Sequence, residues 1–119
     1  MNNMRIEANK TYKIYVSGNT HIYKIGQTSQ HYVSDRIKVI RQTDKDIKLY
    51  AYVEFPGSKP LAEYIEATLR LHLYNKGYTI IGNDHIQKKN SIKVFKKTCL
   101  DIITETLNGL NVNYKVVVK

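Results

Sequence analysis

The stretch KIYVSGNTHIYKIGQTS, residues 13–29, decides the fold of this chain. Residues 12–16 and 22–27 each alternate between two kinds of side chain, which is the pattern of a β-strand. The residues Ser-Gly-Asn-Thr-His, which favour turns, separate the two runs. Together they predict a β-hairpin.

The side-chain pattern also predicts a register for this hairpin. With residues 18–21 as the loop, one face is apolar and the other holds Lys13, Tyr15, Lys24 and Gly26. A slip of one residue would mix the two faces, so the pattern favours this register. The expected cross-strand pairs are Val16–Tyr23, Tyr15–Lys24, Ile14–Ile25 and Lys13–Gly26.

A lysine opposite a tyrosine has a chemical use. Free tyrosine titrates near ~10, and a neighbouring cation favours the phenolate and lowers that pKa. Tyr15 beside Lys24 could then take a proton from water near neutral pH. The structural alternative is a solvent-exposed tyrosine with the lysine stem lying over its ring, and the hairpin alone favours this alternative.

Two further elements follow the hairpin. Residues 31–42 predict a helix with Thr28 or Ser29 as its cap. Its buried positions at helical spacing are Val33, Ile37 and Ile40. Residues 47–55 alternate strictly and predict a third strand with one covered face. That face is made of Ile47, Leu49, Ala51, Val53 and Phe55.

The second half of the chain predicts two longer helices. Pro60 suits the first turn of a helix that runs to about Asn75, with Gly77 as a stop. Residues 78–87 are a short strand or a loop, and residues 91–107 form the next helix. Val112–Val118 is a final edge strand or an ordered tail. The apolar stripes of the two helices are Leu61, Ile65, Leu69 and Leu73, and Ile92, Phe95, Cys99, Ile102 and Ile103.

The element order predicts an α+β domain with a three-stranded, mainly antiparallel sheet flanked by helices, in the order β-β-α-β-α-α. The chain of 119 residues, with 42% hydrophobic residues, fits a single domain over residues 1–119. One cysteine excludes a disulfide framework and a cysteine-rich zinc site within one chain. The first ten residues do not resemble a signal peptide, and no window approaches ~18 apolar residues. We therefore expect a soluble intracellular protein with no membrane partner.

The charge points to an anionic partner. The formal net charge is +9 and the sequence pI is about 9.6, which favours nucleic acid first and an anionic membrane surface second. Residues 88–97, KKNSIKVFKK, hold five lysines and no acid, and they form either a solvated face or a surface that follows phosphates. These lysines are Lys88, Lys89, Lys93, Lys96 and Lys97.

The order of several short motifs resembles the GIY-YIG nuclease superfamily. They are KIY at residues 13–15, YKIG at residues 23–26, Arg36 on a helix and Glu66 on a later helix. The stretch YKIGQT looks like the Y-K-I-G-x-T of small stand-alone members from phages and large viruses. The resemblance covers roughly residues 12–86, with a basic helix and tail over residues 88–119. It implies a GIY-YIG-like fold and a metal-dependent DNA endonuclease.

The resemblance also implies a role for each matching residue. Tyr15 would be the general base toward the attacking water, and Lys24 stands where the second motif usually has tyrosine. Gly26 matches the motif glycine, Arg36 the arginine on the phosphate, and Glu66 the glutamate that binds one Mg²⁺ or Mn²⁺ ion. The accessory positions are His31 and Asn83, and Lys13 replaces the glycine of the first motif at an edge that faces DNA.

Each assignment has a structural alternative. Arg36 could be an ordinary exposed arginine, and Glu66 could pair with Arg70 four residues later, with Glu63 as the competing carboxylate. The remaining histidines show no ligand spacing, so surface or satisfied polar roles are expected for His21, His72 and His85.

The leading hypothesis is therefore a DNA endonuclease that acts on double-stranded DNA, either alone or as a homodimer. A composition rich in lysine, asparagine, isoleucine and tyrosine hints at a phage or viral protein, in the cytoplasm of a bacterial host or in a eukaryotic cytoplasm or nucleus. One carboxylate makes a weak site, so we expect strong metal binding only with DNA present. The alternatives are a non-catalytic nucleic-acid-binding module that keeps the fold and a basic protein-interaction domain.

Overall fold

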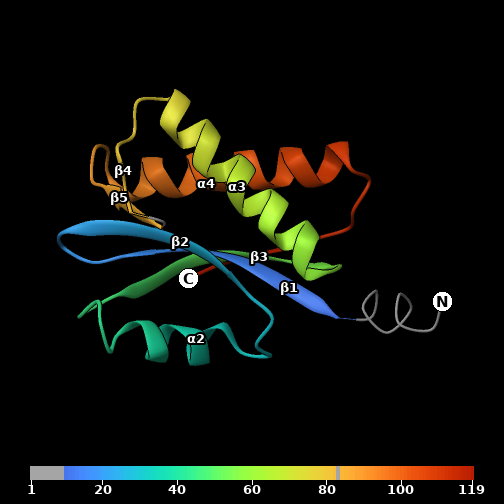
Figure 1. Ribbon diagram of the computed structural model, residues 1–119, viewed down its shortest axis with the longest axis horizontal. Coiled ribbons are helices and arrows are strands. Elements are labelled where there is room, and N and C mark those ends of the chain that lie inside the picture. The colour runs from blue at the N-terminus through green and yellow to red at the C-terminus, as the bar shows by residue number, and fades with distance from the viewer. Residues whose placement is uncertain (1–9, 83) are drawn as a thin grey trace.

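The computed structural model describes residues 10–82 and 84–119 (Figure 1). These residues form a six-stranded antiparallel sheet and three helices. The strand order across the sheet is β4-β5-β2-β1-β3-β6. In chain order the elements are β1 (Thr11–Gly18), β2 (Ile22–Thr28), α2 (Val33–Ile40), β3 (Lys48–Pro56), α3 (Lys59–Asn75), β4 (Ile80–Ile81), β5 (His85–Gln87), α4 (Ile92–Gly109) and β6 (Lys115–Val118).

The sheet is wider than the three strands that the sequence predicts. Its centre is the expected β2-β1-β3 arrangement, but β5 and β4 continue it beyond β2, and β6 continues it beyond β3. The added strands lie in residues 78–87 and 112–118, for which the sequence allowed either a strand or an irregular segment. They are two to four residues long, so they carry too little alternation to be recognised from sequence.

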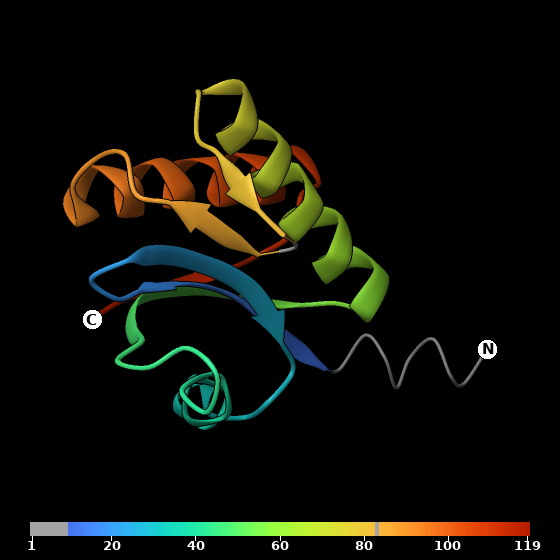
Figure 2. The same cartoon turned by 60° about the vertical axis from the view of Figure 1, so that its left-hand side comes forward.

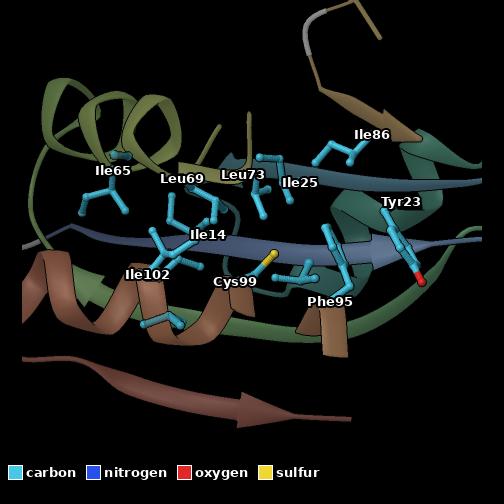
Figure 3. Close-up of a cluster of buried hydrophobic side chains, with 14 of the residues drawn as sticks. Ile14, Tyr23, Ile25, Ile65, Leu69, Leu73, Ile86, Phe95, Cys99 and Ile102 are labelled. Atoms are coloured by element: carbon cyan, nitrogen blue, oxygen red, sulfur yellow. The ribbon is translucent and has the colours of Figure 1, made fainter. Parts of the chain in front are cut away.

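Helices cover both faces of the sheet (Figures 1 and 2). α3 and α4 pack on one face around the larger core, in which Tyr23 stacks on Phe95 with ring centroids 4.0 Å apart (Figure 3). α2 covers the other face through Val33, Ile37 and Ile40, which pack with Tyr15. Of the residues predicted as the covered face of the third strand, Ile47, Ala51, Val53 and Phe55 are buried. The prediction that they share one face is wrong, because they lie on both faces of the sheet.

A β-bulge explains why the alternation in β3 misleads. Val16 pairs with Ala51, but the next residue of β1, Ser17, pairs with Leu49, so one residue of β3 has no opposite partner. An extra residue reverses which side chains point to which face. Val53 and Phe55 consequently enter the larger core, whereas Ile47 and Leu49 pack on the α2 face.

The hairpin keeps the predicted faces but not the predicted register. Tyr15 pairs with Gly26 and Ser17 with Lys24, a shift of two residues from the expected pairing of Tyr15 with Lys24. The cause is Asn19, whose side-chain oxygen accepts from the amides of His21 and Ile22 at 2.8 and 3.0 Å and sets the turn. Because strands repeat every two residues, the shift leaves both faces intact.

The ends of the helices follow local chemistry, with one exception. The Ser58 and Ser91 hydroxyls accept from the backbone amides of the first turns of α3 and α4, and Gly77 follows α3 with φ +92°. α2 instead begins after Tyr32 without a side-chain cap, and the Thr28 hydroxyl accepts from the amide of Gln30. The expected cap from Thr28 or Ser29 is therefore wrong.

In residues 10–82 and 84–119, no helix is long and apolar enough to cross a membrane.

Candidate functional site

The candidate site lies along the second half of β2. β5 pairs with β2 only over Ile22–Lys24, so beyond Lys24 this side of β2 has no neighbouring strand among the described residues. A hollow of about 310 Å³ opens near this unpaired edge. Its lining residues are Tyr12, Gln27, Thr28, Ser29, Gln30, Arg36 and Lys59.

Tyr15 is buried, with 1% of its surface exposed, and its ring lies across Gly26. A Cβ atom added at Gly26 would come within 2.2 Å of the Tyr15 hydroxyl oxygen, so no other residue fits at position 26 without moving the phenol. The structure thus gives a physical reason for the glycine of YKIG. It also shows that the alternative of a solvent-exposed Tyr15 is wrong.

Burial raises the pKa of Tyr15 above its ordinary value of 10.0. The Arg36 guanidinium, as a hydrogen-bond donor and as a charge, and the more distant Lys24 charge act in the opposite direction without overcoming this effect. The prediction that Lys24 brings the Tyr15 pKa towards neutrality is therefore wrong. At neutral pH Tyr15 is a neutral phenol that can donate a hydrogen bond but accepts a proton poorly.

Arg36 is half-buried on α2 and lies beside the Tyr15 hydroxyl. Its Nε atom is fully buried and has no hydrogen-bond partner in the described residues. The Arg70 Nε atom is buried and unpaired in the same way, and an unpaired buried donor costs roughly 1–3 kcal/mol. Because Arg36 also lines the hollow, its guanidinium is placed to meet an anion there.

Lys24 is 8% exposed and is held by acidic partners rather than by Tyr15. Its Nζ atom lies 2.9 Å from Asp44 Oδ2 and 3.2 Å from Asp84 Oδ2. It also lies 3.3 Å from His85 Nε2, which is itself 3.0 Å from Asp44 Oδ2. We call Lys24, Asp44, Asp84 and His85 the ionic cluster.

The groups of the ionic cluster stabilise one another in their charged forms. Burial by itself would raise the pKa of Asp44, but hydrogen bonds from Lys24 and His85, with the charges of both, lower it below its ordinary value. Burial likewise would lower the pKa of Lys24, but the bond to Asp44 and the charges of Asp84 and Asp44 raise it. At neutral pH the cluster therefore holds an ammonium and a carboxylate that are paired.

Glu66 projects from α3 and is paired with Arg70, with 3.2 Å between Oε2 and Nη2. Burial is the largest influence on its pKa and raises it; the Arg70 charge lowers it, while the Asp84 charge raises it further. The Arg36 charge also lowers the pKa of Glu66, which indicates that the two side chains lie in the same part of the molecule. The pair expected as a structural alternative is present, and the competitor Glu63 is exposed.

The Glu66 carboxylate meets only part of what a hard cation such as Mg²⁺ needs. A partly buried carboxylate under the negative field of Asp84 is stabilised by a nearby cation, and oxygen ligands match Mg²⁺. No group of three or more His, Cys, Asp or Glu side chains within residues 10–82 and 84–119 has the arrangement of a metal site. Glu66 would therefore hold a metal ion only together with water and oxygen atoms of a substrate.

The remaining predicted positions are Lys13, His31 and Asn83. Lys13 is buried rather than at an edge open to DNA, so that expectation is wrong. Lys13 is 2% exposed and its Nζ donates to the Gln30 carbonyl at 2.7 Å, which fixes the loop that enters α2. His31 is exposed, edge-on to the ring of Tyr32. Asn83 lies outside the residues that the structure describes.

Residues 88–97, which hold five lysines, lead into and begin α4, which lies on the face of the sheet opposite to α2 (Figure 1). Lys88 lies 5.2 Å above the Tyr23 ring, Lys89 donates to the Lys76 carbonyl, and Lys97 is paired with Asp101 at 2.8 Å. Lys93 is exposed and Lys96 is partly exposed. A single ligand that contacts both Arg36 and these lysines would have to pass around an edge of the sheet.

Sequence reasoning missed three members of the ionic cluster: Asp44, Asp84 and His85. Asp44 and His85 lie 20 and 61 residues from Lys24 along the chain, so no local spacing connects them. Comparison with protein-family models, curated proteins and solved structures gave no match. The function is therefore argued from the residues of the site.

Proposed function

We propose that this protein is a metal-dependent DNA endonuclease of the GIY-YIG type, which hydrolyses phosphodiester bonds. The observation that carries the proposal is the meeting of Tyr15, Gly26 and Arg36. These residues come from three motifs that are separate in sequence, yet the phenol lies across the glycine and beside the guanidinium. Glu66 shares the same electrostatic neighbourhood.

Each residue would supply one requirement of phosphodiester hydrolysis. Arg36 would bind the oxygens of the scissile phosphate and neutralise the charge that develops in the transition state. Glu66 would hold one divalent ion, Mg²⁺ or Mn²⁺, which when bound stabilises that charge and the leaving 3′ oxygen. Tyr15 would orient the attacking water and act as its general base.

The raised pKa of Tyr15 sets a condition on its role as general base. A buried neutral phenol takes a proton from water only at alkaline pH or when another group accepts that proton. Cleavage by Tyr15 alone should therefore accelerate as the pH rises towards and above the ordinary tyrosine range.

DNA is the proposed substrate because the chain carries a net charge of +9 and an arginine beside a hollow. One site cuts one strand. Cleavage of both strands would need either a second copy of the protein or a second encounter with the same DNA.

The decisive experiment is cleavage of supercoiled plasmid with Mg²⁺ or Mn²⁺. We expect the wild type to produce nicked or linear plasmid, and Tyr15→Phe, Arg36→Ala and Glu66→Ala each to slow this by about 100-fold or more. Glu63→Ala, on the exposed face of α3, is the matched control and should cleave as the wild type does. Absence of cleavage of single- and double-stranded DNA and RNA with either metal would rule the enzyme out.

A non-catalytic nucleic-acid-binding module is the second candidate. Lys24 stands at the position where the family usually has tyrosine. The ionic cluster favours this second candidate, because it holds Lys24 away from Tyr15. This alternative predicts salt-dependent DNA binding that Arg36→Ala weakens, together with no metal-dependent cleavage.

A further inference from the structure

His85 lies on the same face of the sheet as Tyr15. It pairs with Lys24 across β5 and β2, and Lys24 is two residues from Gly26, the partner of Tyr15. Residues two apart on a strand, and residues directly opposite on neighbouring strands, point to the same face. From strand geometry the Cα atoms of His85 and Gly26 are about 8 Å apart.

Asp44 fixes the orientation of the His85 ring. Its Oδ2 atom lies 3.0 Å from Nε2, and Nδ1 makes no hydrogen bond with any described residue. In a neutral imidazole one nitrogen donates and the other accepts, so a proton on Nε2 bonded to Asp44 leaves Nδ1 as the free base. The side chain is 33% exposed, so solvent water can reach it.

Charged groups from three segments surround this ring. The charged groups that face His85 are the Lys24 ammonium from β2, the Asp44 carboxylate from the α2–β3 loop and the Asp84 carboxylate beside it in sequence. One cation and two anions leave a net negative charge around the ring. Tyr15 differs, because its burial opposes a change of charge.

We propose that His85, oriented by Asp44, is the residue that accepts the proton of the attacking water in the hydrolysis. The inference rests on the proposed function and moves the role of general base within it from Tyr15 to His85. As the water oxygen forms its bond to phosphorus, the bond from phosphorus to the 3′ oxygen breaks. The water proton passes to Nδ1 of His85, and the 3′ oxygen leaves with the electron pair and takes a proton from solvent. Tyr15 keeps its proton and orients the water.

Two substitutions separate proton transfer from structural support. His85→Gln retains an amide nitrogen near the position of Nε2, which can still donate to Asp44, but it has no base in place of Nδ1. His85→Ala removes both functions and leaves space that free imidazole can enter.

The measurement is single-turnover cleavage of supercoiled plasmid with Mg²⁺ from about pH 5 to about pH 9, where histidine side chains change charge. We expect the wild-type rate to rise and then level off. His85→Gln should be about 100-fold slower and should lose this bend. Its melting temperature and DNA affinity should match those of the wild type. Added imidazole should partly restore cleavage by His85→Ala.

The outcomes keep the two proposals distinguishable. If the wild type cleaves, and His85→Gln cleaves at the same rate with the same pH profile, this inference is overturned and the proposed endonuclease stands. A rate that climbs with pH without levelling off, in the wild type and in His85→Gln alike, assigns the proton to Tyr15 instead. A wild type that never cleaves overturns both proposals.

Discussion

The two faces of the central sheet are built by the same strands with different chemistry. On the α3 and α4 face, Ile14 and Val16 of β1 enter an apolar core. On the α2 face, the alternating residues Lys13, Tyr15 and Ser17 are buried to the same degree but are polar. Burial of polar groups is unfavourable unless they find partners, so the α2 face depends on specific hydrogen bonds and ion pairs. We infer that one face stabilises the fold and the other holds the site.

The largest expected effect tests the apolar face. Leu69→Ala, at a fully buried position of α3, should lower the free energy of unfolding by about 2–5 kcal/mol, because it removes packed methyl groups and leaves a cavity. Urea unfolding followed by circular dichroism measures this change. Leu71→Ala on the exposed side of the same helix is the control and should have little effect. Equal losses in the two variants would contradict the division between the faces.

Gly26→Ala tests the close approach of Tyr15 on the polar face. The added methyl group would meet the Tyr15 hydroxyl at 2.2 Å, so the phenol must move, at a cost of about 1–3 kcal/mol in unfolding free energy. Gly109→Ala has open space around the new methyl group and should be neutral or slightly stabilising. A thermal melt of both variants makes the comparison, and an unchanged Gly26→Ala would mean that Tyr15 does not lie there in solution.

Asp44→Asn tests the ionic cluster through its pH dependence. The pKa of Asp44 is lowered in the folded protein, so its carboxylate stabilises the fold above about pH 4 and this contribution is lost as the pH falls through the folded pKa. We expect a loss of about 2 kcal/mol at pH 7 that shrinks on acidification. Asp46→Asn, at an exposed position with φ +61° that asparagine tolerates, is the control. A loss for Asp44→Asn that is the same at every pH would argue against the ion pair.

The smallest effect on stability is expected in the basic segment. Reversing charge with Lys93→Glu and Lys96→Glu should leave the melting temperature unchanged, since neither side chain forms an ion pair among the described residues. DNA affinity should fall and its dependence on salt should flatten if this face follows phosphates. Lys115→Glu with Lys119→Glu gives the same change in net charge at the start of β6 and directly after it. If both pairs weaken binding equally, only the total charge matters.

The periodic parts of the fold could be predicted, because they depend on neighbours in sequence. Val33, Ile37 and Ile40 were identified as the buried side of α2 from their spacing alone, and Leu69 and Leu73 as part of the buried side of α3. The faces of the hairpin were also correct. Its register was not, because Asn19 sets the turn through bonds of its side chain, which alternation does not reveal.

The candidate site was predictable only in part. The resemblance of the short motifs to a nuclease superfamily implied Tyr15, Gly26 and Arg36, and these residues lie together in the structure. The bulge in β3 and the partners of Lys24 left no local signal. Asp44 meets Lys24 only because the loop after α2 is brought against β2, and His85 only because β5 pairs with it.

The sequence by itself determined which side of β1, β2 and the helices turns inward, because a side chain's direction follows from the periodicity of its own segment. The bulge in β3 broke this periodicity. Only the tertiary structure decided the charge states on which the chemistry depends. Tyr15 keeps its proton because α2 buries it, and Lys24 is neutralised by carboxylates from two distant segments. Desolvation and ion pairing depend on what packs around a group in space, and that is set only when the distant segments meet.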